Sequence, residues 1–192
     1  MTKFFKSLFV AAMFAGTSLA AHAAPVDISH APVDLTADLL DYSSSDLINS
    51  FTLKQGQLAG ADHNFFSDTY TFSLSGSNDL SALATSLKAN AGSGLTLTGL
   101  SLGNANGILF HGALDLVNYT LQDQAWVLQS GNTPLSAGSY FLKIDGYVAS
   151  PAGGSYSGNL AIAAVPEPET YGMLLVGLGL IGFVARRRRS QA

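Results

Sequence analysis

Cysteine is absent from this 192-residue sequence, and charged side chains make up only 11% of it. Without cysteine no disulfide can staple the fold, so apolar packing must hold it together. Basic residues are scarcest between positions 24 and 165, where Lys54, Lys88 and Lys143 face eleven aspartates and no arginine occurs. An acidic segment of this kind excludes nucleic acid and polyanionic polymers as partners that are bound by charge.

The same segment lacks the usual clusters of metal-binding and catalytic residues. Its histidines are His30, His63 and His111, and none has a second histidine at zinc-ligand spacing. Asp62-His63-Asn64 offers oxygen ligands to calcium but lacks the spacing of a known calcium loop. We therefore expect no metal, no cofactor and no enzymatic activity. An extracellular hydrolase remains an alternative, and it would need two carboxylates that converge in a cleft.

Two short matches to catalytic motifs lie in the wrong context. Residues 99–103 read Gly-Leu-Ser-Leu-Gly, as in a nucleophile elbow, but a loop sequence follows where that motif needs a helix. Residues 177–182 match a dinucleotide-binding pattern inside an apolar run that no strand precedes. Neither match predicts an active site.

The first 23 residues have the layout of a secretory signal peptide. Lys3 and Lys6 precede a short apolar stretch, and small residues follow it. Ala21 and Ala23 supply the small side chains that signal peptidase requires, so we expect cleavage after Ala23, with Ala24 as the first mature residue. A permanent N-terminal anchor is the alternative, although the apolar stretch is short.

The other end of the sequence combines an apolar run with a basic cluster. We expect residues 170–185 to form a transmembrane helix that is slightly short for a bilayer, and Arg186, Arg187, Arg188 and Arg189 to anchor it on the cytoplasmic side. A core helix followed by a nucleic-acid-binding run does not account for an apolar character on every face.

Two prolines precede the apolar run, in the sequence Val165-Pro166-Glu167-Pro168-Glu169. Each proline fixes its own φ and disfavours the helical region for the residue before it. Residues 165–169 are therefore predicted to be extended and exposed, in a form that a membrane-embedded processing enzyme could grip.

Pro166-Glu167-Pro168, the Gly-rich apolar run and the arginine cluster together resemble the PEP-CTERM sorting signal, over residues 165–189. The resemblance implies recognition of the Pro-Glu-Pro motif and removal of the tail by an exosortase. It also implies an association with biofilm matrix and exopolysaccharide. The sequence Phe66-Ser-Asp-Thr-Tyr-Thr-Phe72 is in addition similar to the FxDxF-type PEP-CTERM proteins, except that Tyr70 stands where the pattern has phenylalanine.

Residues 24–164 are predicted to form one all-β domain, an antiparallel β-sandwich of jelly-roll type. Apolar and hydroxyl side chains alternate with the period of two that is typical of half-buried strands, and Gly/Asn clusters mark turns between them. The expected strands cover residues 50–54, 69–75, 95–102, 113–121, 125–129, 139–149 and 155–163.

Four local features refine this prediction. The apolar phase changes across Gly99, which predicts a β-bulge in the strand 95–102. Leucines at 80, 83 and 87 have the spacing of a short helix, and residues 38–50 suit either a helix or a loop. Asp68 stands where a strand is expected to begin, so we expect its carboxylate to accept hydrogen bonds from turn N–H groups.

The whole pattern predicts an exported surface or extracellular-matrix protein. Its expected partners are signal peptidase, exosortase, the inner membrane for a limited time and exopolysaccharide. A permanently anchored protein, a secreted carbohydrate-binding module and an ice-binding-type protein are the alternatives. The aromatic residues that could stack on sugars are Tyr119, Trp126, Tyr140, Tyr147 and Tyr156. Threonine pairs that could order water occur at residues 69–71 and 96–98, but they form no continuous array.

Overall fold

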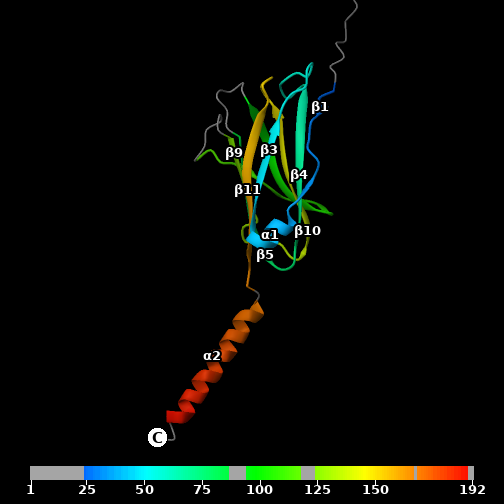
Figure 1. The fold of residues 1–192 in the computed structure, drawn as a ribbon. Coiled ribbons are helices and arrows are strands. Elements are labelled where there is room, and N and C mark those ends of the chain that lie inside the picture. The colour runs from blue at the N-terminus through cyan, green and yellow to red at the C-terminus, as the bar shows by residue number, and fades with distance from the viewer. Residues whose placement is uncertain (1–23, 87–93, 118–123, 167, 190–192) are drawn as a thin grey trace, which may run out of the picture.

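The protein folds as two β-sheets packed face to face, with a long helix that extends away from them (Figure 1). The computed structural model describes residues 24–86, 94–117, 124–166 and 168–189. One sheet has the order β1-β4-β10-β6-β7, with β2 also paired to β4, and the other has the order β3-β11-β5-β9-β8. This architecture of two sheets agrees with the expected sandwich.

The first sheet contains β1 (Val26–Asp27), β2 (Val33–Asp34), β4 (Asn64–Leu74), β6 (Leu95–Asn104), β7 (Gly107–His111) and β10 (Gly138–Val148). The second contains β3 (Ser44–Phe51), β5 (Asn78–Ser86), β8 (Ala113–Leu114), β9 (Gln124–Gln129) and β11 (Gly154–Ala164). The helices are α1 (Thr36–Tyr42) and α2 (Pro168–Arg189). The long strands pair antiparallel, whereas β1 and β2 run parallel to β4.

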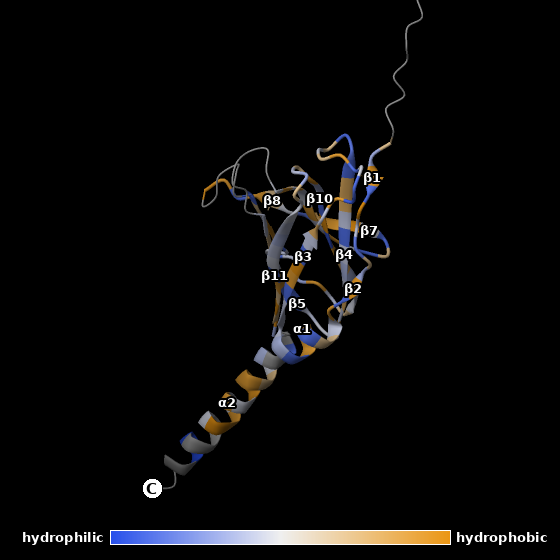
Figure 2. Ribbon diagram, turned by 45° about the horizontal axis from the view of Figure 1, so that its top comes forward, coloured by the Kyte–Doolittle hydropathy of each residue, from blue (hydrophilic) through white to orange (hydrophobic). Residues whose placement is uncertain are grey.

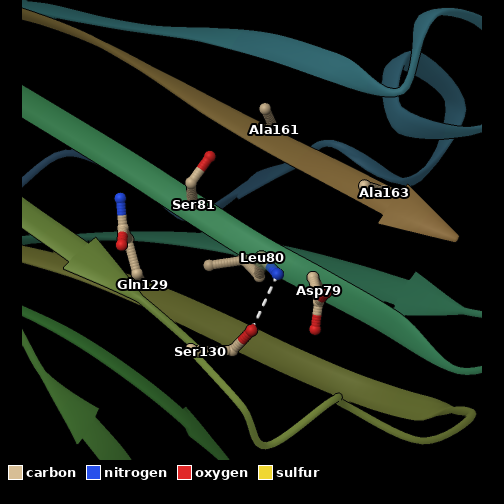
Figure 3. Close-up of a pocket in the computed structure, with 8 residues that line it drawn as sticks. Asp79, Leu80, Ser81, Gln129, Ser130, Ala161 and Ala163 are labelled. Carbon is tan, nitrogen blue, oxygen red and sulfur yellow. Dashed lines mark hydrogen bonds between the residues drawn. The ribbon is translucent and has the colours of Figure 1, made fainter. Parts of the chain in front are cut away.

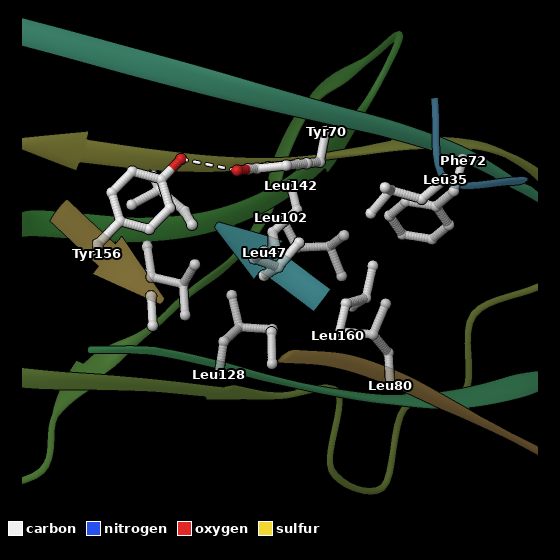
Figure 4. Packing of buried hydrophobic residues seen from close by; sticks show 14 of the residues in the cluster. Leu35, Leu47, Tyr70, Phe72, Leu80, Leu102, Leu128, Leu142, Tyr156 and Leu160 are labelled. Atoms are coloured by element: carbon white, nitrogen blue, oxygen red, sulfur yellow. Dashed lines mark hydrogen bonds between the residues drawn. The ribbon is translucent and has the colours of Figure 1, made fainter. Parts of the chain in front are cut away.

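The core lies between the sheets because every second side chain of the long strands points inward. In β4 the inward residues are buried while those between them stay partly exposed. Figure 4 shows Phe72 and Leu142 of the first sheet meeting Leu80 and Leu160 of the second. Burial of each such side chain stabilises the fold by about 1.5–3 kcal/mol, so this interface supplies the stability that disulfides do not.

The bulge expected at Gly99 is confirmed. In the pairing of β10 with β6, Asp145 lies opposite Gly99 and Gly146 lies opposite Leu97, which leaves Thr98 without an opposite residue. The extra residue returns Leu100 to the buried face, where the apolar phase of the sequence had shifted.

The helix expected at Leu80, Leu83 and Leu87 is wrong over its described part. Residues up to Ser86 belong to β5, in which Leu80 points into the core and Leu83 points outward. Hydrogen bonds from β9 on one side and β11 on the other hold this segment extended, and this tertiary pairing overrides the leucine spacing. Leu87 lies outside the described residues.

Two other expected boundaries also change. The segment 38–50 contains the end of α1 and most of β3, so the strand expected at 50–54 begins at Ser44 instead and ends at Phe51. Ser43 makes this switch in a left-handed conformation, with φ at 57°. The strand expected at 113–121 is a strand only at Ala113–Leu114, and the structure does not describe residues 118–121.

The segment 24–35, here called the N-terminal strap, lies along the outer edge of β4. Its backbone N–H groups at Val26, Ile28 and Leu35 donate to carbonyl groups of the β4 region. Asp27 and Asp34 accept bonds from Ser29 and Thr36 two residues later, and these bonds hold the pKa of both carboxyl groups below the usual value. The strap therefore satisfies an edge that would otherwise be open.

Helix α2 is coated by exposed apolar side chains, which appear in orange along its length in Figure 2. Among the residues that the structure describes, no helix is long and apolar enough to cross a membrane. The transmembrane helix expected at residues 170–185 is therefore not supported by the structure.

Candidate functional site

The most unusual group inside the sandwich is the carboxylate of Asp68. Asp68 lies in β4, on its inward face, and only 1% of it is exposed. The expectation that it caps a turn is wrong, because β4 begins four residues earlier, at Asn64, and carries Asp68 in its interior. A buried carboxylate is stable only if hydrogen-bond donors surround it.

Four donor groups from three segments of the chain surround this carboxylate. His30 of the strap donates its backbone N–H at 2.8 Å, and its ring Nδ1 lies 3.2 Å from Asp68 Oδ2. Asn49 Nδ2 of β3 and the Tyr156 hydroxyl of β11 each donate to Oδ2 at 2.7 Å. Asp68 therefore ties the first sheet to both the strap and the second sheet.

The hydroxyl groups of Tyr70 and Tyr156 extend this network, with 2.8 Å between the two oxygens (Figure 4). Burial raises the pKa of both tyrosines, and the bond to Asp68 raises the pKa of Tyr156 further, so both hydroxyl groups remain protonated donors. Each carboxylate oxygen of Asp68 has at least one donor. This arrangement suits a structural role, in which Asp68 links the two sheets and the strap, rather than a reactive one; we call these hydrogen bonds the Asp68 staple.

We expect Tyr156→Phe to lower the free energy of unfolding by about 2 kcal/mol, because the substitution removes one donor from a buried carboxylate. Urea unfolding followed by the fluorescence of the single tryptophan, Trp126, measures this loss. Tyr147→Phe is the matched control, because Tyr147 points outward from β10, and we expect it to change stability by less than about 0.5 kcal/mol. Equal effects of the two substitutions would contradict the staple.

The hollows on the outer face of the second sheet are shallow and lined by small side chains. The one in Figure 3, about 250 Å³ in volume, is lined by Asp79, Ser81 and Gln129 among others. Beneath it, Ser130 Oγ accepts a hydrogen bond from the Leu80 N–H at 2.9 Å. Its described lining contains one carboxylate, whereas acid/base hydrolysis requires two.

The aromatic residues that could have stacked on sugars do not share a face. Tyr140 and Tyr156 are buried, and Trp126 packs against the core. Tyr147 lies on the outer face of the first sheet, and Tyr119 lies outside the described residues. The described part of the chain therefore presents no platform built from these aromatics.

The short motif matches also lie away from any site geometry. Residues 99–103 are part of β6 rather than a turn between a strand and a helix, and residues 177–182 lie inside α2. Over the described ranges, no three side chains of His, Cys, Asp or Glu are grouped so that they could hold a metal ion.

The junction between sandwich and tail has the exposure that a processing enzyme requires. Strand β11 ends at Ala164, and the Val165 N–H makes the last backbone bond to the sandwich, to the Ser77 carbonyl at 2.9 Å. Pro166 follows with its side chain exposed. Helix α2 begins at Pro168, so the expectation that residues 165–169 are extended is wrong for Pro168 and Glu169. Proline is well suited to the first turn of a helix, because its missing N–H costs nothing there. Glu167 lies outside the described residues.

The far end of α2 carries the arginine cluster, of which Arg186 and Arg187 are exposed. Cations at a helix C-terminus are stabilised by the helix dipole, and Glu169 in the first turn has the complementary effect. Arg188 and Arg189 complete α2. At the other end of the protein, Ala24 is exposed at the start of the strap, whereas Ala21, Ala23 and the rest of the expected signal peptide lie outside the described residues.

Comparison with known proteins adds one local match. No curated protein sequence matches the chain. Similar solved structures include the pre-peptidase C-terminal domain of collagenase from Bacillus anthracis, with a TM-score of 0.33 at 14% identity over 73% of this chain and 98% of that one. Another is PliG, a periplasmic inhibitor of g-type lysozyme from Aeromonas hydrophila, with a TM-score of 0.38 at 12% identity over 72% of this chain and 100% of that one. Both similarities are too weak to support an argument.

The family model that matches is described as the PEP-CTERM protein-sorting motif, and it covers residues 164–189. These residues include the end of β11, the exposed junction and α2. This match lies outside residues 66–72, so the FxDxF resemblance of the sandwich is not confirmed. Residues 164–189 thus carry a PEP-CTERM sorting motif, which implies an exported, membrane-anchored precursor with an exosortase as its processing partner.

Proposed function

We propose that this protein is a non-enzymatic surface or matrix protein that an exosortase releases from its tail. The observation that carries the proposal is the junction inside the matched sorting motif, where Pro166 is exposed directly after the half-buried Val165. A protease binds its substrate as an extended chain, and this junction can be gripped without disturbing either sheet.

The tail supplies the means of holding the precursor until it is processed. Apolar side chains of α2 are exposed on every side, and in water they would remain uncovered. We propose that the membrane covers them, while Arg186 to Arg189 stay on the cytoplasmic side because transfer of each arginine across a bilayer costs about 2.5 kcal/mol or more. Cleavage near Pro166 then frees the sandwich.

The outer face of β4 supports a matrix role over a specific binding role. Its outward side chains are Phe65, Ser67, Thr69, Thr71 and Ser73, of which four carry hydroxyl groups. The hydroxyls of Ser67 and Ser73 bond to Asp145 and Ser139 of the neighbouring strand β10. A polar surface of this kind, which is rich in hydroxyl groups, suits hydrated contact with neutral polymers such as exopolysaccharide.

The test is the intact mass of the protein recovered from its native host, with and without the exosortase. We expect a mass that ends between Pro166 and Glu169, and retention of the tail through Ala192 when the enzyme is absent. Pro166→Ala with Pro168→Ala should reduce the processed fraction at least tenfold, because both prolines of the Pro-Glu-Pro motif are lost.

Pro151→Ala is the matched control, since Pro151 is an exposed proline in a turn of the sandwich, away from the motif. Its processing should equal that of the unmodified chain. A tail that persists in the presence of the enzyme would contradict the proposal and would indicate a permanent membrane anchor.

A further inference from the structure

Sheet edges expose unpaired backbone groups, and over the described residues three of the four edges of the two sheets are protected. The N-terminal strap covers β4. Strand β7 has five residues and a bulge in its pairing, and β8 has two residues. The fourth edge is β3, which has eight residues and pairs with β11 without a register shift. Native proteins shorten, bend or cover edges to prevent association, so one long straight edge is an exception.

The backbone groups that β3 leaves free can be named from its register. Ser43 O accepts a bond from Ile162 N, and these two residues continue the register in which Phe51 lies opposite Gly154. Because antiparallel partners exchange bonds at every second residue, the odd-numbered residues of β3 bond to β11. The N–H and C=O groups of Ser44, Asp46, Ile48 and Ser50 therefore point away from the sheet.

Apolar side chains lie beside this open edge. Ile48 is 65% exposed on the edge strand itself, and Leu40 and Tyr42 of the adjoining α1 are 65% and 77% exposed. The strand contains no proline and no lysine, and Asp46 is its one charged residue. Exposed apolar groups next to unpaired backbone groups favour the addition of another strand.

We propose that β3 pairs with β3 of a second copy of this chain, antiparallel about a two-fold axis at Leu47. This inference goes beyond the sorting function and does not depend on it. In this register Ser44 lies opposite Ser50 of the other copy, and Asp46 lies opposite Ile48. All four outward residues of each copy then exchange backbone bonds, and the two five-stranded sheets join edge to edge.

The charges of the edge are compatible with this register. No carboxylate lies directly opposite its own copy, which would be destabilising. Lys54 is exposed and lies three residues beyond the end of β3. In the proposed dimer it lies near the first residues of β3 of the other copy, where α1 of that copy carries Asp38 and Asp41. The two-fold axis repeats this contact, so the lysine and the acidic helix complement each other twice.

A cysteine pair tests the register directly, because the natural sequence contains no cysteine. The full-length chain carries both S44C and S50C and is kept in a mild detergent that covers α2. Its two thiols are then oxidised. Opposite residues in a bonded pair have Cα atoms about 5.5 Å apart, within disulfide range. The two positions within one chain are six residues apart along a strand, roughly 20 Å, so no intramolecular bond can form.

We expect the double-cysteine chain to form a covalent dimer in at least fivefold higher yield than either single-cysteine chain. D46C with S50C is the register control, because these positions lie opposite each other only if the axis moves to Ile48. Its dimer yield should stay near that of the single-cysteine chains. Equal yields for all variants would overturn the proposal.

Sedimentation of the cysteine-free chain gives a second measurement. Ile48→Pro removes an outward N–H without breaking a bond to β11, so it should weaken dimerisation at least tenfold, whereas Ile48→Thr should not.

The charge contact is tested in the same way. Lys54→Glu should weaken dimerisation more than Lys143→Glu, which makes the same charge change on the outer face of β10. A chain that remains monomeric, or binds only a foreign strand at this edge, would refute pairing between copies.

Discussion

Asp68→Ala is expected to lower the free energy of unfolding by about 4 kcal/mol. The substitution removes the buried acceptor that the donors of His30, Asn49 and Tyr156 share inside the sandwich. A typical domain is stable by about 5–15 kcal/mol, so a large part of the stability should be lost. Urea unfolding followed by Trp126 fluorescence measures the effect.

Asp145→Ala provides the matched control for this result. Asp145 is also a strand aspartate, but it is partly exposed and accepts a bond from the Ser67 hydroxyl on the outer face. We expect a loss below about 1 kcal/mol there. If Asp68→Ala were as mild as Asp145→Ala, the buried carboxylate would not be holding the sheets and the strap together.

Gly158→Ala is expected to destabilise the sandwich by about 3 kcal/mol. A Cβ atom at Gly158 would collide with the backbone oxygen of Leu83 and crowd the Cα atom of Ala84. Both atoms belong to β5, which pairs with β11 at this point, so neither can move unless the pairing of the two strands is disturbed.

Gly76→Ala tests whether the close approach, rather than the loss of glycine itself, causes this effect. A Cβ atom at Gly76 would meet no atom within 4 Å. Its unfolding midpoint in urea should match that of the unmodified chain or exceed it slightly, because alanine reduces the freedom of the unfolded chain. Equal destabilisation of both variants would show that the contact with β5 is not the cause.

Strands whose pattern is local could be predicted from the sequence. The alternation around Tyr70 and Phe72 gives β4, and the phase change at Gly99 gives the bulge, since both follow from the period of a pleated strand. The leucines at 80 and 83 misled the prediction because their spacing suits a helix. Pairing of β5 on both sides, by β9 and β11, decided otherwise.

The role of Asp68 could not be predicted from its neighbours in the sequence. Its partners Asn49 and Tyr156 lie 19 and 88 residues away, and they meet the carboxylate only when the two sheets pack. The sequence around Phe66 to Phe72 signals a strand that carries an acid. The alternation places Asp68 on the same face as Phe66, Tyr70 and Phe72, so its burial was a signal that the sequence offered. The sequence does not indicate which donors satisfy the buried carboxylate, because they come from other segments of the chain.

What the sequence alone determined is the tail, because the chemistry of the sorting motif lies within residues 164–189. A Pro-Glu-Pro segment, an apolar run and adjacent arginines act within a few turns of chain, so their order is sufficient. Only the tertiary structure decided which groups bond to the carboxylate of Asp68 and which sheet edge leaves its backbone groups unpaired. Both depend on strands far apart in the sequence, whose pairing is fixed by burial of the common core.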